Sequence, residues 1–304
     1  MEKKKGLSLQ TVLTIAGLAL IYLLAFLLDR IPGIPIMLTT VLRKGAIYSL
    51  VAVSMNLLNG FTGLFSLGQA GFMLVGAYTF AVLNISSGIR STVYQYYDPL
   101  LKFSLTETLQ NVLGNTAGTV LGVFISLLLA GFLAAVLAYL IGLPVLKLKS
   151  DYLAIATLGF AEILRAIFQW QTLGKVTNGA NILKGYPTFA DFNITNASGK
   201  VLFRLSAVVP ILLAGICIFL IVLLINSSYG RAFKAIRDDE IAAEAMGVNL
   251  AKHKSLSFVI SSFFAGVSGA LFAMFATTVQ AKVFTSAMTY EILLIVVIGG
   301  IGSV

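Results

Sequence analysis

The stretch of sequence that decides the fold reads Asn56-Leu57-Leu58-Asn59-Gly60-Phe61-Thr62-Gly63-Leu64-Phe65-Ser66-Leu67-Gly68-Gln69-Ala70-Gly71. It lies in the middle of an uncharged run of 45 residues, from Gly45 to Ile89. As a helix rising about 1.5 Å per residue, this run would be about 67 Å long, or two crossings of a bilayer core about 30 Å thick. The glycine density of its middle opposes a continuous helix. Because non-helical backbone at membrane depth needs protein or a water-filled cavity around it, we predict two helices joined by a broken or re-entrant segment, near residues 56–71, that faces the bundle interior.

The composition of the whole chain agrees with a membrane protein. Of its 304 residues, 58% are hydrophobic and only 11% are charged, whereas a soluble domain carries about 25% charged residues. The same numbers exclude disorder. One cysteine, Cys217, and one histidine, His253, exclude a disulfide framework and a multi-histidine metal centre, so no metal or cofactor is expected. The net charge of +9 does not indicate nucleic acid, because the basic residues occupy short segments between apolar runs.

Six further apolar runs predict membrane-spanning helices, at residues 6–28, 118–141, 152–170, 205–225, 255–281 and from 289 onward. With the two helices of the first run, we predict an all-α, polytopic bundle of about eight transmembrane helices forming a single domain over residues 1–304. Residues 6–28 are too long for a signal peptide. The helix over 118–141 should stop before Pro144. The last helix has only 16 residues before the chain stops, so we expect it to be truncated at 304.

Small residues recur at every fourth position in two of these helices. They are Ala130, Ala134, Ala138 and Gly142 in the first, and Ala265, Gly269 and Ala273 in the second. Such stripes allow helix backbones to approach closely inside a membrane.

The distribution of basic residues predicts the orientation. Segments 1–10, 142–151 and 226–254 carry ten Lys and Arg residues in 49 positions, whereas segments 29–44, 85–117, 171–204 and 280–288 carry ten in 92 positions. Cytoplasmic segments are the richer in Lys and Arg. We therefore predict a cytoplasmic N-terminus, a cytoplasmic loop over 226–254 and an external loop over 171–204. The external loop is either a docking surface for a partner protein or an unspecialised connection.

Motifs for catalysis are absent from the sequence. It contains no H-E-x-x-H, no G-x-S-x-G and no G-x-x-x-x-G-K-[ST] phosphate-binding loop. We therefore predict a chain that is not an enzyme and has no ATPase motif of its own, and we set aside an intramembrane hydrolase.

The cytoplasmic loop contains an alanine-rich segment, residues 238–247, that we call the knob. Asp238 is a plausible N-cap, acidic residues suit the first helical turn, and Gly247 suits the left-handed residue after a helix. Ile241, Ala242, Ala245 and Met246 share one face at helical spacing. The knob is either an amphipathic helix lying on headgroups or an insert for a partner's groove. Alanines and four acidic residues favour the protein partner.

Several stretches together resemble LivM-type branched-chain amino acid permeases of ATP-binding-cassette importers. The resemblance rests on the loose Glu-Ala-Ala-x-x-x-Gly pattern in Glu240–Gly247, on Leu57–Phe72 with Gly76-Ala77-Tyr78, on Leu146–Arg165 and on Gly299–Ser303. It covers most of the chain from about residue 45. The stretch Thr177–Asn181 is a looser version of the family's glycine-rich segment.

The resemblance implies a permease subunit that moves branched-chain amino acids inward by alternating access across a bacterial cytoplasmic (inner) membrane. The partners that the resemblance implies are a second permease subunit as a heterodimeric mate, two cytoplasmic ATPase subunits and an external substrate-binding protein. The residues implied in coupling to the ATPase are Arg231, Arg237, Asp238, Asp239, Glu240, Ile241, Ala242, Ala243, Glu244 and Gly247.

Polar residues inside the predicted spans are candidates for a translocation path, namely Asn56, Asn59, Gln69, Thr157, Glu162 and Arg165. Charged residues at membrane depth normally face the bundle interior or water. Glu162 and Arg165 are three residues apart and can pair, either as a gate or as a structural pair. The four uncharged residues either line the path or bond neighbouring helices. Glu291 is expected at the membrane boundary, facing headgroups.

Two alternative functions remain open at this point. One is a secondary transporter driven by an ion gradient, with Glu162 as the proton or cation carrier. The other is a related permease for urea or amides.

Overall fold

The computed structural model describes residues 36–148, 150–195, 201–203, 205–206 and 208–303. The long helices are α2 (Ile36–Asn56), α3 (Gln69–Asn84), α6 (Asn115–Val145), α7 (Ser150–Gln169), α9 (Val208–Asn226), α12 (Leu250–Ala276) and α13 (Ser286–Gly299). A π-helical segment, η1 (Leu57–Phe61), extends α2. The short helices are α4 (Ser87–Val93), α5 (Leu105–Leu113), α8 (Gly174–Thr177), α10 (Ser228–Asp238) and α11 (Glu240–Ala245).

The strands among the described residues are short and form two antiparallel pairs, of which the first packs against α3. β1 (Leu183–Lys184) pairs with β4 (Thr278–Val279), with Leu183 opposite Val279. β2 (Ile194–Thr195) pairs with β3 (Val201–Phe203). Single 3₁₀ turns are η2 (Gln171–Leu173), η3 (Phe189–Phe192) and η4 (Ala281–Val283). The predicted all-α class is confirmed.

Five helices among the described residues are long and apolar enough to cross a membrane: Met37–Phe61, Asn115–Val145, Tyr152–Gln169, Val208–Asn226 and Leu250–Ala276. The predicted pair of helices in the first apolar run is present as α2 with η1 and as α3, which has 16 residues. The last predicted span is α13, with 14 residues. The helix predicted over residues 6–28 lies outside the described residues.

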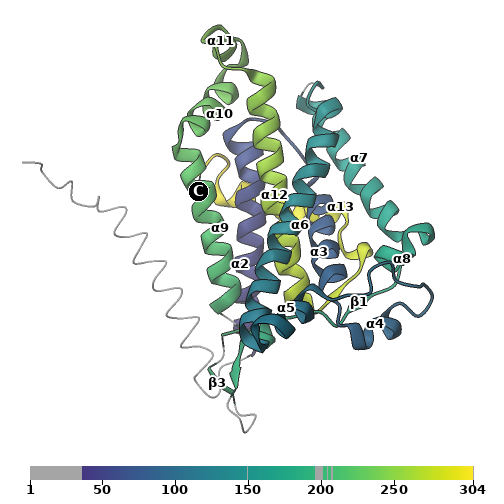
Figure 1. The fold of residues 1–304 in the computed structure, drawn as a ribbon. Coiled ribbons are helices and arrows are strands. Elements are labelled where there is room, and N and C mark those ends of the chain that lie inside the picture. The colour runs from purple at the N-terminus through teal and green to yellow at the C-terminus, as the bar shows by residue number, and fades with distance from the viewer. Residues whose placement is uncertain (1–35, 149, 196–200, 204, 207, 304) are drawn as a thin grey trace, which may run out of the picture.

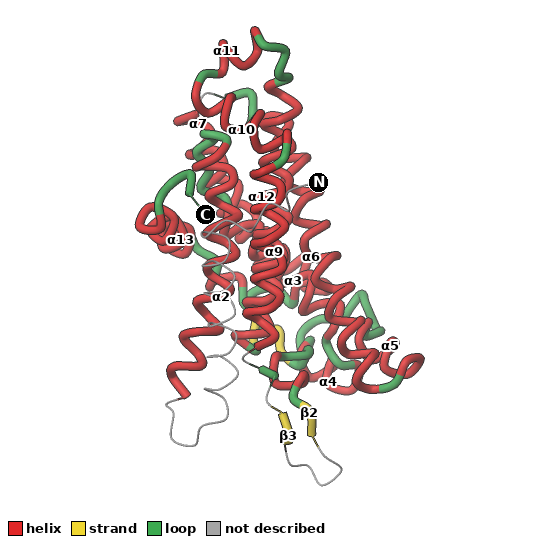
Figure 2. The backbone as a smooth tube through the Cα atoms, turned by 90° about the vertical axis from the view of Figure 1, so that its left-hand side faces the viewer, coloured by secondary structure: helices red, strands yellow, loops and turns green. Residues whose placement is uncertain are grey.

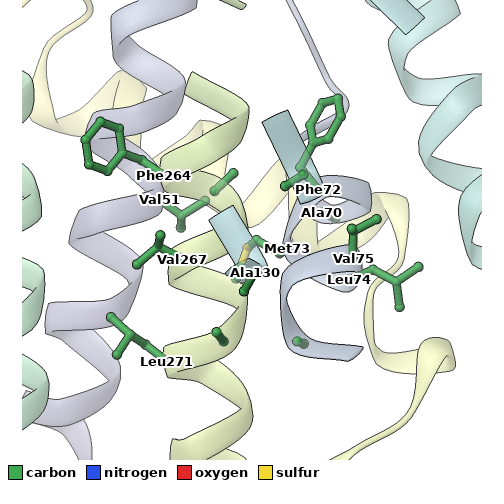
Figure 3. Close-up of a cluster of buried hydrophobic side chains, with 14 of the residues drawn as sticks. Val51, Ala70, Phe72, Met73, Leu74, Val75, Ala130, Phe264, Val267 and Leu271 are labelled. Carbon is green, nitrogen blue, oxygen red and sulfur yellow. The ribbon is translucent and has the colours of Figure 1, made fainter. Parts of the chain in front are cut away.

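The core lies where α3, α6 and α12 pack against one another (Figures 1 and 3). Figure 3 shows Met73 of α3 close to Ala130 of α6, with Val267 and Leu271 of α12 alongside. Glycines permit this approach, because a Cβ on Gly76 would lie 1.9 Å from the carbonyl oxygen of Gly266. The predicted small-residue stripes are confirmed as packing faces, since Ala130, Ala134, Ala138, Ala265 and Ala273 are all fully buried.

Helix α6 corrects one boundary prediction. It continues through Pro144 to Val145 rather than stopping before the proline. The Leu146 amide still donates to the Gly142 carbonyl at 2.9 Å. Since proline removes only one intrahelical hydrogen bond and the helix ends within two residues, the final turn tolerates it. A second boundary also differs from the prediction. Helix α13 starts at Ser286, three residues before the predicted start at residue 289.

The two ends of the bundle carry different elements (Figures 1 and 2). α10 and α11 lie at one end together with the start of α7, and α4, α5 and β3 lie at the other. This is the grouping that the distribution of basic residues predicts, because segments 142–151 and 226–254 share one end. The described residues of segments 85–117 and 171–204 share the opposite end.

Candidate functional site

The knob is a separate short helix held at a sharp corner after α10. Asp239 has an extended backbone (φ −160°, ψ 112°), and its Oδ1 accepts hydrogen bonds from the Ile241 amide at 2.8 Å and the Ala242 amide at 3.0 Å. The N-cap is therefore Asp239, and the prediction of Asp238 was wrong. Asp238 is the last residue of α10, and its carboxylate pairs with Arg237 at 2.9 Å. A residue in helical conformation does not cap the next helix.

Backbone hydrogen bonds close the far end of the knob, and a salt bridge ties its first turn to α12. Gly247 has a positive φ of 86°, as predicted for the residue after a helix end. The Val248 amide donates to the Ala243 carbonyl at 3.0 Å. Lys254 of α12 forms a salt bridge with Glu240 at 2.6 Å. Both ends of α11 are thus held, and the knob projects as a defined element.

The outer surface of the knob is apolar and exposed. Ile241 is 82% and Met246 85% exposed, and Ala242 and Ala245 are exposed beside them. Ala243, in contrast, is only 4% exposed. The shared face predicted from helical spacing is present. Two large apolar side chains at the tip of a protrusion are the pattern of an interaction surface.

A cluster that we call the glycine junction connects α10 to the broken helix. It consists of Asn56, Gly60, Arg237, Gly302 and Ser303. Arg237 Nη1 donates to the Gly60 carbonyl at 3.1 Å. Asn56 Oδ1 accepts from the Gly302 amide at 2.9 Å, and Asn56 Nδ2 donates to the Ser303 carbonyl at 2.5 Å.

Gly60 has no space for a side chain in this junction. A Cβ there would lie 2.0 Å from Asn56 Oδ1 and 2.4 Å from the Gly302 amide nitrogen. The glycine-rich segment 299–303 therefore packs directly on the π-helical turn η1. Single π-helical turns are frequent at functional sites. The predicted break near residues 56–71 is present as η1 and the following non-helical residues 62–68.

The remaining uncharged candidates also surround this break. Asn59 Oδ1 accepts from the Ser66 amide at 3.0 Å. Thr157 Oγ1 of α7 accepts from the Leu67 amide at 3.0 Å. Gln69 Nε2 donates to Ser261 Oγ of α12 at 2.9 Å, while its buried Oε1 has no hydrogen-bond partner. The structure thus places four of the predicted residues around the break, where their side-chain hydrogen bonds hold the broken segment to its neighbours: Asn56, Asn59, Gln69 and Thr157.

Glu162 and Arg165 form the predicted pair on α7. Arg165 Nη2 lies 2.6 Å from Glu162 Oε2, and both side chains are roughly a third exposed. The other carboxylate oxygen of Glu162 accepts from the Ser286 amide at 3.1 Å. Ser286 is the first residue of α13. A carboxylate at this place satisfies a free amide and interacts favourably with the helix dipole.

Sequence reasoning missed a polar cavity of about 630 Å³ at the end of the bundle opposite the knob. Asn84, Thr106 and Glu107 are among its lining residues. Burial opposes ionisation of Glu107, but hydrogen bonds from Ser86 and Ser87 outweigh it and lower the pKa of this carboxyl. Nothing in the local sequence distinguishes Glu107 from an ordinary acidic residue of a first helical turn.

Buried Arg90 of α4 was also missed. Its Nη2 donates to the carbonyls of Val82 and Ile85, at 3.3 and 2.8 Å, and its Nη1 donates to the Leu101 carbonyl. Arg90 thus bonds the carbonyls at the end of α3, which a helix leaves unsatisfied. A basic residue shortly after a helix is the only sequence signal for this role.

The fold and these contacts define a polytopic helical membrane protein with a broken intramembrane helix and an apolar knob at one end. Residues 37–304 match the family model described as branched-chain amino acid transport system, permease component. The chain belongs to this family.

Curated relatives support the assignment. The chain is 34% identical over 278 residues to the high-affinity branched-chain amino acid transport system permease protein LivM of Salmonella typhimurium, and 33% identical to that of Escherichia coli. Each alignment covers 84% of this chain and 57% of the relative. A probable branched-chain amino acid transport permease protein LivM of Methanocaldococcus jannaschii is 26% identical, over 88% of this chain and 76% of the relative. No solved structure matches the chain significantly. The chain thus spans little more than half the length of the two bacterial relatives.

Proposed function

We propose that the chain is a membrane-spanning permease subunit of an ATP-binding-cassette importer that carries branched-chain amino acids inward by alternating access. The single observation that carries this proposal is the apolar knob, which is exposed at its tip and connected through Arg237 to the broken helix. A permease without an ATPase motif needs such a contact with a separate motor. The printed names of the relatives support the substrate class.

In this mechanism the knob inserts into a groove on an ATPase subunit, with Ile241 and Met246 as anchors. Apolar side chains that protrude from a helix are the usual contacts of a helix-in-groove interface. Movement of the ATPase would displace α10 and α11 as one body, because the Asp239 cap and the Lys254 salt bridge hold the start of α11 and the hydrogen bond from the Val248 amide to the Ala243 carbonyl holds its end. The displacement reaches η1 through the hydrogen bond from Arg237 to Gly60.

The proposed assembly contains a second permease subunit as the heterodimeric mate, two ATPase subunits and an external substrate-binding protein. We place it in a bacterial cytoplasmic (inner) membrane, with the N-terminus and the loop 226–254 in the cytoplasm. The grouping of segments 142–151 and 226–254 at one end of the bundle supports this orientation, as cytoplasmic segments are enriched in basic residues. The loop 171–204 then lies outside, where a binding protein would dock.

The contacts of Glu162 argue against the ion-gradient alternative. A proton or cation carrier needs a carboxylate that can exchange its partners. Glu162 instead uses one oxygen for Arg165 and the other for the first amide of α13. This arrangement favours a structural role for Glu162 and leaves the ATP-driven importer as the better-supported function.

Replacement of Ala245 tests the proposal. Ala245→Arg places a bulky charge on the exposed face of the knob, so we expect the ATPase subunits to be lost from the purified complex. Uptake of leucine into proteoliposomes should fall about tenfold, since a buried charge at an interface costs several kcal/mol. The matched control is Ala117→Arg, at an exposed position of α6 far from the knob.

The importer proposal is overturned if Ala245→Arg leaves both co-purification and uptake unchanged. Uptake that persists without ATPase subunits but stops when an ionophore collapses the ion gradient would establish the secondary transporter instead. Uptake of urea or acetamide, but not leucine, by the complete complex would establish the related permease class.

A further inference from the structure

A hollow of about 510 Å³ lies between α2, the last turns of α12 and the first turns of α13. Its walls include Lys44 and Tyr48 of α2, Phe272 and Phe275 of α12, and Met288 and Glu291 of α13. The volume is in the range of small-molecule sites, about 300–1,000 Å³. The hollow lies toward the end at which α12 ends and α13 begins, which is opposite the knob.

The two charges in this hollow require an explanation. Lys44 and Glu291 are both exposed, although they belong to apolar helices of the bundle. Within the described part of the chain, neither side chain forms an ion pair. Lys44 Nζ lies over the ring of Tyr48, 5.1 Å from its centroid. Charged side chains are too costly to face hydrocarbon, so this surface faces water or a polar ligand rather than lipid chains.

The chemistry of the walls matches one class of ligand. An ammonium group on one side and a carboxylate on the other complement the carboxylate and ammonium groups of a zwitterion. Phe272, Phe275 and Met288 provide an apolar surface next to the two charges. An apolar wall with a few convergent polar groups is the usual composition of a ligand pocket. A bare anion or a bare cation would leave one of the two protein charges unmatched.

We propose that this hollow binds a zwitterion with an apolar side chain, and that the ligand is a free α-amino acid. Lys44 holds its carboxylate, Glu291 holds its ammonium group, and the aromatic wall contacts its side chain. The inference rests on the proposed function as an importer, because an amino acid released by an external binding protein would meet the hollow at the external end of the bundle. The zwitterionic headgroup of phosphatidylethanolamine shares this charge pattern, so the experiment separates the two sources.

The test uses protection of a thiol in the assembled complex. Cys217→Ser removes the only cysteine of the chain, and Thr285→Cys places a thiol in the wall of the hollow. The matched control is Thr278→Cys, at an exposed position of β4 that does not line the hollow. The complex is placed in nanodiscs of phosphatidylglycerol, and the rate of maleimide labelling is measured. The added probes are leucine, 4-methylpentanoate, which lacks the ammonium group, and 3-methylbutylamine, which lacks the carboxylate.

We expect millimolar leucine to slow labelling at position 285 about fivefold or more and to leave labelling at position 278 unchanged, because a bound zwitterion engages both protein charges. Each analogue at the same concentration should protect far less. Glu291→Gln should abolish the preference for leucine over 4-methylpentanoate, and Lys44→Met the preference over 3-methylbutylamine. These losses of discrimination distinguish ligand contacts from a purely structural role.

Three outcomes would overturn the assignment. Equal protection by leucine and both analogues would show that the charges do not recognise a zwitterion. Protection by phosphatidylethanolamine in the nanodisc but not by leucine would retain the zwitterion chemistry and overturn the free amino acid as its source. Leucine uptake with no protection at position 285 would overturn the hollow as a binding site while the importer function stands. Absence of leucine uptake by the unmodified complex would instead be a failure of the proposed function.

Discussion

Arg237 joins the apolar knob to the interior of the bundle through a single side chain. Its guanidinium bonds the carboxylate of Asp238 with Nε and Nη2 and the carbonyl of Gly60 with Nη1. The planar fork of arginine suits two partners in fixed directions, which lysine does not reproduce. Because Asp238 belongs to α10 and Gly60 to η1, this residue is where movement of one element reaches the other.

We expect Arg237→Leu to uncouple ATP hydrolysis from transport. The side chain is partly exposed, so its loss should change the melting temperature little, while leucine uptake falls about tenfold because one charged hydrogen bond, worth about 1.5–3 kcal/mol, is removed. ATPase activity and leucine uptake measured in the same proteoliposomes check this. Lys252→Met, at an exposed position near the knob, should leave both rates unchanged. Equal loss of ATPase activity and uptake would contradict the linking role.

Gly60 and Gly45 provide a matched pair for the packing of the junction. A Cβ on Gly60 would collide with Asn56 and Gly302, whereas a Cβ on Gly45 meets no atom within 4 Å. We expect Gly60→Ala to lower the free energy of unfolding by about 1–3 kcal/mol through overpacking. Gly45→Ala should raise it by about 0.5–1 kcal/mol, because alanine suits a helix interior better. Thermal unfolding of the purified protein in detergent measures both changes, and a stabilising Gly60→Ala would refute the described packing.

At the scale of elements, α11 is too short to be stable alone. It has six residues, and helices shorter than about 12–15 residues are marginal in water. Its stability therefore depends on the Asp239 cap, the Glu240–Lys254 salt bridge and the burial of Ala243. A rigid knob can transmit force, whereas a frayed one cannot.

Removal of the cap should fray the knob without unfolding the bundle. We expect Asp239→Ala to destabilise α11 by about 1 kcal/mol, whereas Asp239→Asn retains a capping oxygen and should restore most of the loss. Hydrogen exchange of the amides of residues 241–245 reports the fraying directly, and the amides of α12 serve as the internal reference. If exchange in the knob is the same in Asp239→Ala as in the parent, the cap does not stabilise α11.

At the scale of the whole molecule, the two ends of the bundle separate two kinds of surface. The end with α10 and α11 presents the knob, and the opposite end carries the polar cavity near Glu107 and the hollow between Lys44 and Glu291. An importer needs a motor contact on one side and access for its substrate on the other. The arrangement fits that requirement only if the two ends lie on opposite faces of the membrane.

Sidedness can be measured with the single native cysteine removed. In a Cys217→Ser background, we expect Met246→Cys to react with an impermeant maleimide only in inside-out vesicles and Thr278→Cys only in right-side-out vesicles. The basic segments 142–151 and 226–254 are the physical reason, since Lys and Arg are retained in the cytoplasm. Both positions are exposed, so the two labels are comparable. Reaction of both thiols from the same side would overturn the topology, and the reversed pattern would overturn the importer orientation.

Much of the architecture follows from the sequence by itself: the helical class, the approximate spans, the break near residues 56–71 and the grouping of loops at two ends. Each depends on a local property, because the cost of placing charges or unpaired backbone groups in hydrocarbon is set by the run of residues itself. The pair of Glu162 and Arg165 was predictable for the same reason, since three residues separate them on one helix.

Only the tertiary structure decided which distant groups meet. Asn56 bonds Gly302 across 246 positions of sequence, Glu162 bonds the first amide of α13 across 124, and Lys44 and Glu291 share one hollow. These contacts depend on which helices pack together and in which rotation, and the apolar helices here offer many nearly equivalent faces. The close approaches that glycine allows between α3 and α12, and between η1 and Gly302, select one packing, and the candidate sites exist because of that choice.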